Sequence, residues 1–163
     1  MKKRGRISLL LTVMALFGST QTSISSEKLR STIPMENKGA GTYYVDVHLE
    51  GLGVADFLVD TGSTYTAINE KTLAALKRQG TVTYVKDLAG VMADGRHKIV
   101  PVYRLSALRI GKDCFIDNVE IAVFPGESRS ILGLNALGKA APFVFSTLPP
   151  SLVLSRCSSR TKA

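Results

Sequence analysis

The sequence predicts a mostly-β domain, a small β-barrel or sandwich that carries one or two short helices. Three observations support this fold class. Short apolar segments rich in β-branched residues recur along the chain, glycine and proline turns separate them, and only one stretch has a clear helical pattern. Many short strands with few helices are typical of barrels and sandwiches. At 163 residues the chain has the length of one domain with its own core.

The first strands are predicted to form a hairpin. In residues 43–49, "YYVDVHL", the side chains of Val45, Val47 and Leu49 alternate with polar ones and therefore share one face. The turn "GLG" follows, and the apolar run "VADFLV" at residues 54–59 predicts the second strand.

A short helix is predicted within residues 68–80, "INEKTLAALKRQG". Asn69 is the expected N-cap, because its side chain can accept a hydrogen bond from a backbone N–H of the first turn. Ile68, just before the cap, can pack against Leu73 as a hydrophobic staple. Gly80 is expected to end the helix, since glycine readily adopts the left-handed conformation that follows helix C-termini.

The rest of the chain is predicted to consist of strands joined by tight turns. Gly95, Gly111, Gly126 and Pro149 mark turns between apolar runs. The expected strands cover residues 81–88, 97–105, 106–110, 114–124, 130–132, 142–145 and 151–154.

The N-terminus predicts export. Lys2, Lys3, Arg4 and Arg6 precede an apolar run at residues 7–17, which is the pattern of a secretory signal peptide. This run is well short of the ~20 residues of a membrane-spanning helix, although a retained N-terminal anchor stays an alternative. We therefore expect a protein of the periplasm or cell envelope, with the membrane as a partner only if the segment is retained.

These features divide the chain into four parts. The expected parts are a signal peptide or anchor at 1–25, a linker at 26–32, the folded domain at 33–156 and a loose tail at 157–163. The net charge of +8 falls by half when the four N-terminal cations are set aside. No basic stripe remains elsewhere, so a nucleic-acid partner is not expected.

The two cysteines, Cys114 and Cys157, leave two alternatives open. In an oxidising compartment they can form a disulfide that closes a long loop, or they can remain unlinked thiols. A metal site is not expected, because the only histidines, His48 and His97, have no Cys or His at ligand spacing.

One acid stands where a buried strand is expected to end. In the string "FLVDTGST", Asp60 follows three apolar residues and precedes Thr61, Gly62 and Ser63. Other catalytic motifs are excluded, because "GLGVAD" lacks the third glycine of the dinucleotide fingerprint and "GESRS" is not a nucleophile elbow. Asp60 is therefore the candidate for chemistry.

A second signal, the string "SILGLNALG", lies at residues 130–138. The order of strand, acid turn, long β stretch, two apolar residues, glycine and short helix resembles the retropepsin-like aspartic proteases, in particular their bacterial, exported members. The resemblance covers residues 33–155. The string "TIPMENKGAGTYYVDVHLEGLGVADFLVDTGST" looks like the opening strands and active-site loop of that family, and "PFVFSTLPPSLVLS" looks like its closing hairpin.

The resemblance implies a role for each residue of the motif. Asp60 would be the catalytic acid, and Thr61 would lock two active-site loops together by hydrogen bonds. Gly62 would allow a tight turn and offer its N–H to the carboxylate. Ser63 would bond the outer oxygen of Asp60 and restrain its orientation.

The resemblance also implies a flap and a cleft floor. The string "AGVMADGRH" at residues 89–97 falls where the family has its flap hairpin, and small residues there allow motion and a close approach to a peptide. The flap candidates are Gly90, Val91, Met92, Ala93, Asp94 and Gly95. The cleft floor would consist of Ile131, Leu132 and Gly133, with Gly133 allowing close packing beneath Asp60.

The implied chemistry needs two carboxylates. Without a metal or a cofactor, one group must take a proton from water while another protonates the carbonyl oxygen. Two carboxylates about 3 Å apart share one proton and fill both roles. The sequence has one Asp-Thr-Gly, so a homodimer would place two copies of Asp60 across a two-fold axis.

The expected function is therefore that of an aspartic endopeptidase acting on polypeptides. The alternative is a peptide-binding module on the same fold, which holds extended peptides by strand addition without cleaving them. By the resemblance, terminal strands at residues 32–35 and 151–154 would interleave between the two chains of the dimer. The other possibility is that each strand completes the barrel of its own chain, so that removing it unfolds the monomer.

Overall fold

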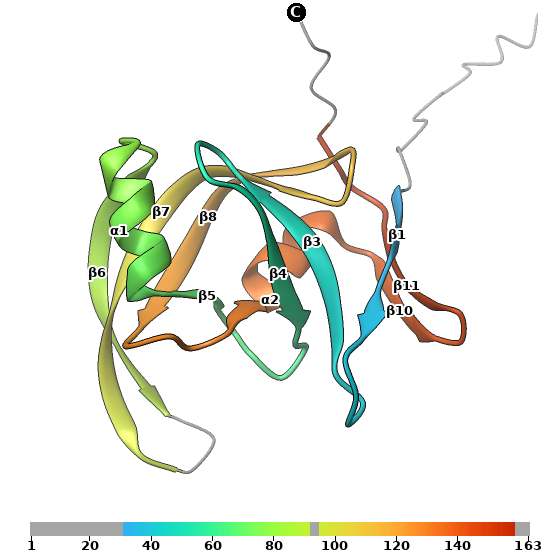
Figure 1. Cartoon of the computed structure of the whole chain (residues 1–163), viewed down its shortest axis with the longest axis horizontal. Coiled ribbons are helices and arrows are strands. Elements are labelled where there is room, and N and C mark those ends of the chain that lie inside the picture. Colours follow the sequence, from blue (N-terminus) through green and yellow to red (C-terminus); the bar gives the residue numbers. More distant parts are fainter. Residues whose placement is uncertain (1–30, 92–94, 159–163) are drawn as a thin grey trace, which may run out of the picture.

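The computed structural model describes residues 31–91 and 95–158 of the chain (Figure 1). Its strands are β1 (Ser31–Pro34), β2 (Glu36–Asn37), β3 (Tyr43–Leu49), β4 (Gly53–Val59), β5 (Thr66–Asn69), β6 (Val82–Val91), β7 (His97–Ile110), β8 (Cys114–Phe124), β9 (Ser130–Leu132), β10 (Phe143–Thr147) and β11 (Pro150–Leu154). Its helices are α1 (Glu70–Arg78) and α2 (Leu134–Leu137), and the 3-10 turn η1 (Gly138–Ala140) follows α2. The predicted fold class, mostly β with short helices, is confirmed.

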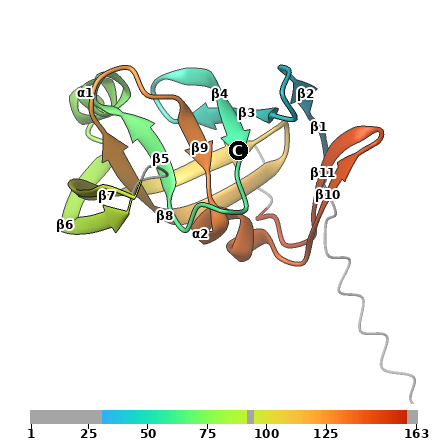
Figure 2. The ribbon, with the colours of Figure 1, turned by 90° about the horizontal axis from the view of Figure 1, so that it is seen from below.

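The strands are arranged in two sheets. An eight-stranded sheet has the order β2-β3-β4-β9-β5-β8-β7-β6, and β3 also pairs with β7, which closes the sheet into a barrel (Figures 1 and 2). At this closure Leu49 lies opposite Leu108, and both side chains are buried in the main core. The second sheet has the order β1-β11-β10 and lies on the side of the barrel away from α1 (Figure 1).

The predicted hairpin forms as β3 and β4, with Val45 opposite Phe57 and Val47 opposite Ala55. Val45, Val47 and Leu49 are all buried, as their alternation predicted. The structure differs in three places. The two strands predicted at residues 97–105 and 106–110 are one long strand, β7, and strands β2 and β5 were not predicted. β5 was missed because Thr66, Ala67 and Ile68 are all buried, which removes the alternation that marks a half-buried strand.

Helix α1 begins and ends at the predicted residues. The Asn69 side chain accepts a hydrogen bond from the Thr72 N–H (2.8 Å), so Asn69 is the N-cap. At the other end Gly80 has φ +67°, and its N–H donates to the Lys77 carbonyl (3.1 Å) while the Thr81 N–H donates to the Leu76 carbonyl (3.3 Å). This pair of bonds is the Schellman motif that glycine favours.

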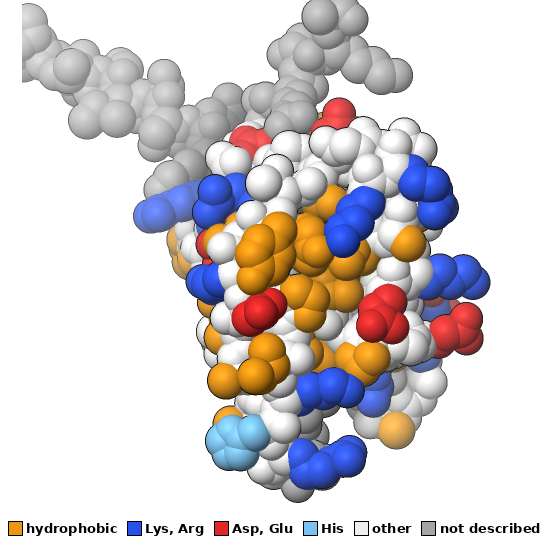
Figure 3. Space-filling view, turned by 90° about the vertical axis from the view of Figure 1, so that its left-hand side faces the viewer, with side chains coloured by type: hydrophobic (Ala, Val, Ile, Leu, Met, Phe, Trp, Pro, Cys, Tyr) orange, Lys and Arg blue, Asp and Glu red, His pale blue; other side chains and the backbone are white. Residues whose placement is uncertain are grey.

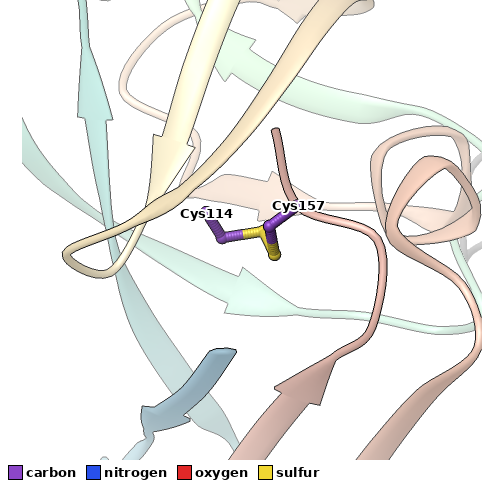
Figure 4. The surroundings of a disulfide bond; sticks show 2 residues. All are labelled: Cys114 and Cys157. Atoms are coloured by element: carbon purple, nitrogen blue, oxygen red, sulfur yellow. A yellow bond between two sulfur atoms is a disulfide. The ribbon is translucent and has the colours of Figure 1, made fainter. Parts of the chain in front are cut away.

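The ends of the folded domain differ from the predicted division. β1 begins at Ser31, inside the predicted linker, because it pairs with β11. Cys157, predicted to start a loose tail, is bonded to Cys114 (Figure 4), and Ser158 pairs with Phe115. The predicted signal segment at 1–25 lies outside the described residues. Within the described ranges, no helix is long and apolar enough to cross a membrane.

The terminal strands pair with each other in one chain. Ile33 lies opposite Leu152, and Ser31 lies opposite Leu154. Ile33, Leu152 and Leu154 are buried in the main core. Of the two arrangements that the sequence left open, this is the one in which the strands complete their own chain, so removal of Ser151 onward is expected to unfold the monomer.

Replacing Leu154 with alanine should reduce the free energy of unfolding by about 2–5 kcal/mol, because the side chain is fully buried and the substitution leaves a cavity. Urea denaturation followed by circular dichroism measures this. Val144→Ala is the control in the adjacent strand β10, since Val144 is 58% exposed and its loss should change stability little. Equal effects of the two substitutions would contradict the placement of β11 in the core.

Candidate active site

Asp60 directly follows β4 and is held by β9. Val59, the last residue of β4, pairs with Leu132 of the parallel strand β9, and the Asp60 N–H donates to the Leu132 carbonyl (3.1 Å). The carboxylate accepts a hydrogen bond from the Gly62 N–H (2.9 Å). Asp60 is half-buried, whereas Thr61 and Gly62 are exposed. The backbone of Asp60 is thus held by β9, and its half-buried carboxylate is oriented by the Gly62 N–H.

Ser63 makes a different bond from the one that the resemblance implied. Its hydroxyl donates to the backbone carbonyl of Tyr65 (2.8 Å). A serine hydroxyl has one proton to donate, so this bond leaves no proton for the outer oxygen of Asp60. In this chain Ser63 therefore fixes the shape of the loop that follows Asp60.

Gly133 lies where the chain after β9 passes closely under the active-site loop. A Cβ on residue 133 would lie 2.4 Å from the Tyr65 carbonyl oxygen and 2.9 Å from that of Ser63. Directly after it, the Leu134 N–H donates to the Ser63 carbonyl (2.8 Å). Of the other predicted floor residues, Leu132 is fully buried and Ile131 is half-buried. The loop therefore rests on backbone rather than on side chains.

A polar bridge between β5, α2 and β8 was not predicted from the sequence. The buried Thr66 donates both its N–H and its hydroxyl to the Asn135 side-chain oxygen (2.8 Å each). The Gly133 N–H donates to the Thr66 hydroxyl oxygen (3.3 Å), and the Asn135 amide donates to the Glu120 carbonyl (2.6 Å). Asn135 is the one polar side chain in "ILGLNAL", and that contrast was the available signal.

The predicted flap lies at the tip of the β6–β7 hairpin. Gly90 pairs with Lys98 and Val91 pairs with His97, and Gly95 has φ +80° beyond them. Met92, Ala93 and Asp94, which were also predicted for the flap, lie outside the described residues. The ends of β6 and β4 point toward the same end of the molecule (Figure 1).

The face of the molecule that carries α1 and β6 has exposed apolar side chains (Figure 3). Tyr84 is 52% exposed, and Val91 and Ile99, near the hairpin tip, are 68% and 72% exposed. These side chains belong to the predicted flap hairpin.

Strand β6 of this hairpin is also tied to the active-site loop. Lys86 donates to Glu120 on β8 (3.0 Å), and its ammonium lies 5.7 Å from the centre of the Tyr65 ring. Arg104 also pairs with Glu120 (3.4 Å). The hydrogen bond from Lys86 lowers the pKa of Glu120, and the same bond, followed by one with Tyr65, raises the pKa of Lys86. The pair is thus charged on both sides of neutral pH.

Metal ligands are not gathered at this site. Among the residues that the structure describes, no three His, Cys, Asp or Glu side chains lie close enough together to hold a metal ion.

The closed β-barrel and the Asp-Thr-Gly-Ser loop held over Gly133 define a domain of the aspartic-protease class. A family model described as aspartyl protease matches residues 45–136, more than half of the chain, and the chain belongs to this family. The predicted family is thereby confirmed.

One similar solved structure is the crystal structure of a retropepsin-like aspartic protease from Rickettsia conorii. It is 18% identical in sequence, the match covers 80% of this chain and 93% of that chain, and the TM-score is 0.55. At this identity the match shows a shared fold, so the fold is retropepsin-like. No curated protein matches the chain.

Replacing Gly133 with alanine should lower the free energy of unfolding by about 1–3 kcal/mol, because the added methyl group overlaps the Tyr65 carbonyl. Thermal denaturation monitored by circular dichroism measures the change. Gly138→Ala is the matched control, since a Cβ there would meet nothing within 4 Å. If Gly133→Ala is no less stable than Gly138→Ala, the close packing under the loop is not a constraint.

Proposed function

We propose that the chain is an aspartic-type endopeptidase whose active site contains two Asp60 carboxylates, one from each chain of a homodimer. The observation that carries the proposal is the half-buried Asp60 carboxylate, on a loop hydrogen-bonded to β9 and present once per chain. The polypeptide-cleaving family to which the chain belongs supports the reaction class.

Each step of the proposed reaction follows from two carboxylates that share one proton. The ionised carboxylate takes a proton from a water held between the two, and the water oxygen attacks the carbonyl carbon of the peptide bond. The protonated carboxylate gives its proton to the carbonyl oxygen. The carboxylate that took the water proton then gives it to the nitrogen as the C–N bond breaks, and the amine leaves. A hydroxyl of the tetrahedral intermediate returns its proton to the other carboxylate, so that the product is a carboxylic acid and the pair again shares one proton. The two acids titrate as a pair.

The loop residues next to Asp60 have defined parts in this proposal. The Gly62 N–H orients the carboxylate through its bond to Oδ1. Thr61 is exposed at the same loop and would meet the loop of the second chain across the two-fold axis. Gly90, Val91 and Gly95 belong to the hairpin that would cover the bound peptide.

We also propose that the protein works outside the cytoplasm. The Cys114–Cys157 disulfide supports this location, since disulfides persist mainly in oxidising compartments. The basic and apolar N-terminus supports export as well. Removal of the N-terminal segment, or its retention as an anchor, is compatible with both features.

Asp60→Asn should abolish cleavage of an unstructured protein substrate while leaving the fold intact, because the amide keeps the shape but can neither take nor share a proton. Gel analysis of the digested substrate measures cleavage, and circular dichroism verifies folding. Asp56→Asn is the control, since Asp56 lies exposed in the preceding strand. Unchanged cleavage by folded Asp60→Asn would refute the assignment. A wild type that binds extended peptides without cleaving them would instead support the peptide-binding alternative.

Adding Asp60→Asn chains to the wild type should inhibit it, because mixed dimers have one carboxylate. With random pairing, a ninefold excess of Asp60→Asn leaves about a tenth of the wild-type activity. Initial rates are measured after the chains have exchanged, and sedimentation verifies that mixed dimers form. Activity that stays constant under a ninefold excess would show that a single chain is sufficient.

A further inference from the structure

A pocket of about 530 Å³ opens beside the active-site loop. Thr64 and Tyr65, from the loop itself, form one wall, and the side chains of Arg104, Glu120 and Lys139 contribute to the others. The pocket is thus bordered by the loop, by β7 and β8, and by the 3-10 turn after α2.

This pocket lies within reach of a substrate bound at Asp60. Thr64 is four residues after Asp60, so their Cα atoms are at most about 14 Å apart. An extended peptide rises about 3.3 Å per residue, and the pocket can therefore receive a side chain within about four residues of the cleaved bond. Lys86 of β6 contacts two residues that line the pocket, the Tyr65 ring and the Glu120 carboxylate.

Positively charged side chains outnumber negatively charged ones around the pocket. Its one lining carboxylate, Glu120, already accepts from Lys86 (3.0 Å) and pairs with Arg104 (3.4 Å). The Lys139 ammonium donates to a backbone carbonyl, that of Asp117 (3.2 Å), which carries no formal charge. The lining therefore has two cations and one acid, and a third cation, Lys86, already binds that acid. The Arg104 and Lys139 side chains are exposed.

We propose that this pocket selects substrates with an acidic side chain within about four residues of the cleaved bond, and that Arg104 and Lys139 bind its carboxylate. The inference rests on the proposed function, since it concerns the substrate of that reaction. A carboxylate would compensate the excess positive charge and could accept charge-assisted hydrogen bonds from both donors. A basic side chain would meet the same cations and be repelled.

The test uses the full chain and a peptide taken from a cleavage site in the unstructured protein substrate, amidated at its C-terminus. Each of the four positions on either side of the cleaved bond carries Glu, Gln or Lys in turn. For wild type, kcat/KM should be about tenfold higher for Glu than for Gln at one position. Lys139→Gln should reduce that ratio severalfold, and Lys139→Glu should reverse it in favour of Lys. Lys112→Gln, which changes an exposed lysine in the turn between β7 and β8, should leave the ratio unchanged.

Each outcome bears on a different claim. Efficient cleavage with equal rates for Glu and Gln at every position refutes the pocket's role and leaves the proposed function standing. A preference for Glu that persists unchanged in Lys139→Glu also refutes the pocket's role and leaves the proposed function standing. If wild type cleaves neither the protein nor any peptide, the proposed function itself fails.

Discussion

The close passage of the chain under the active-site loop at Gly133 is the constraint on which the site depends. With a side chain at this position, the Ser63 and Tyr65 carbonyls could not lie where they do. The same passage brings β9 beside β4, so that the Leu132 carbonyl can accept the Asp60 N–H. The passage of the chain at Gly133 therefore supports the active-site loop and also places the acceptor for the Asp60 N–H.

The polar bridge between Thr66 and Asn135 explains how this crossing is stabilised without a large apolar side chain. The N–H and the hydroxyl of Thr66 are both buried. Leaving either of them without an acceptor would reduce the stability of the fold by about 1–3 kcal/mol. Asn135 supplies that acceptor and also ties the loop to β8 through the Glu120 carbonyl. The loop is thus connected to β9 through Asp60 and to α2 through Asn135, which in turn binds β8.

Local features were predictable from the sequence, and long-range pairings were not. The caps of α1 at Asn69 and Gly80 and the face of β3 follow from short-range periodicity and turn chemistry. The Thr66–Asn135 bridge joins residues far apart in the chain, and nothing in the sequence gives their distance. The Cys114–Cys157 bond was left open for the same reason. The family resemblance supplied the order of the elements, but it misassigned the partner of the Ser63 hydroxyl.

The pairing of the terminal strands limits how a second chain can dock in the proposed dimer. β11 is paired on both edges, with β1 and with β10, so it has no edge to offer to another chain. Among the described strands of this sheet, the free edges belong to β1 and β10. A partner strand could add there without displacing Leu152 or Leu154 from the core. Each chain would then fold before it dimerises, and the fraction of completed sites would depend on protein concentration rather than on the stability of the monomer.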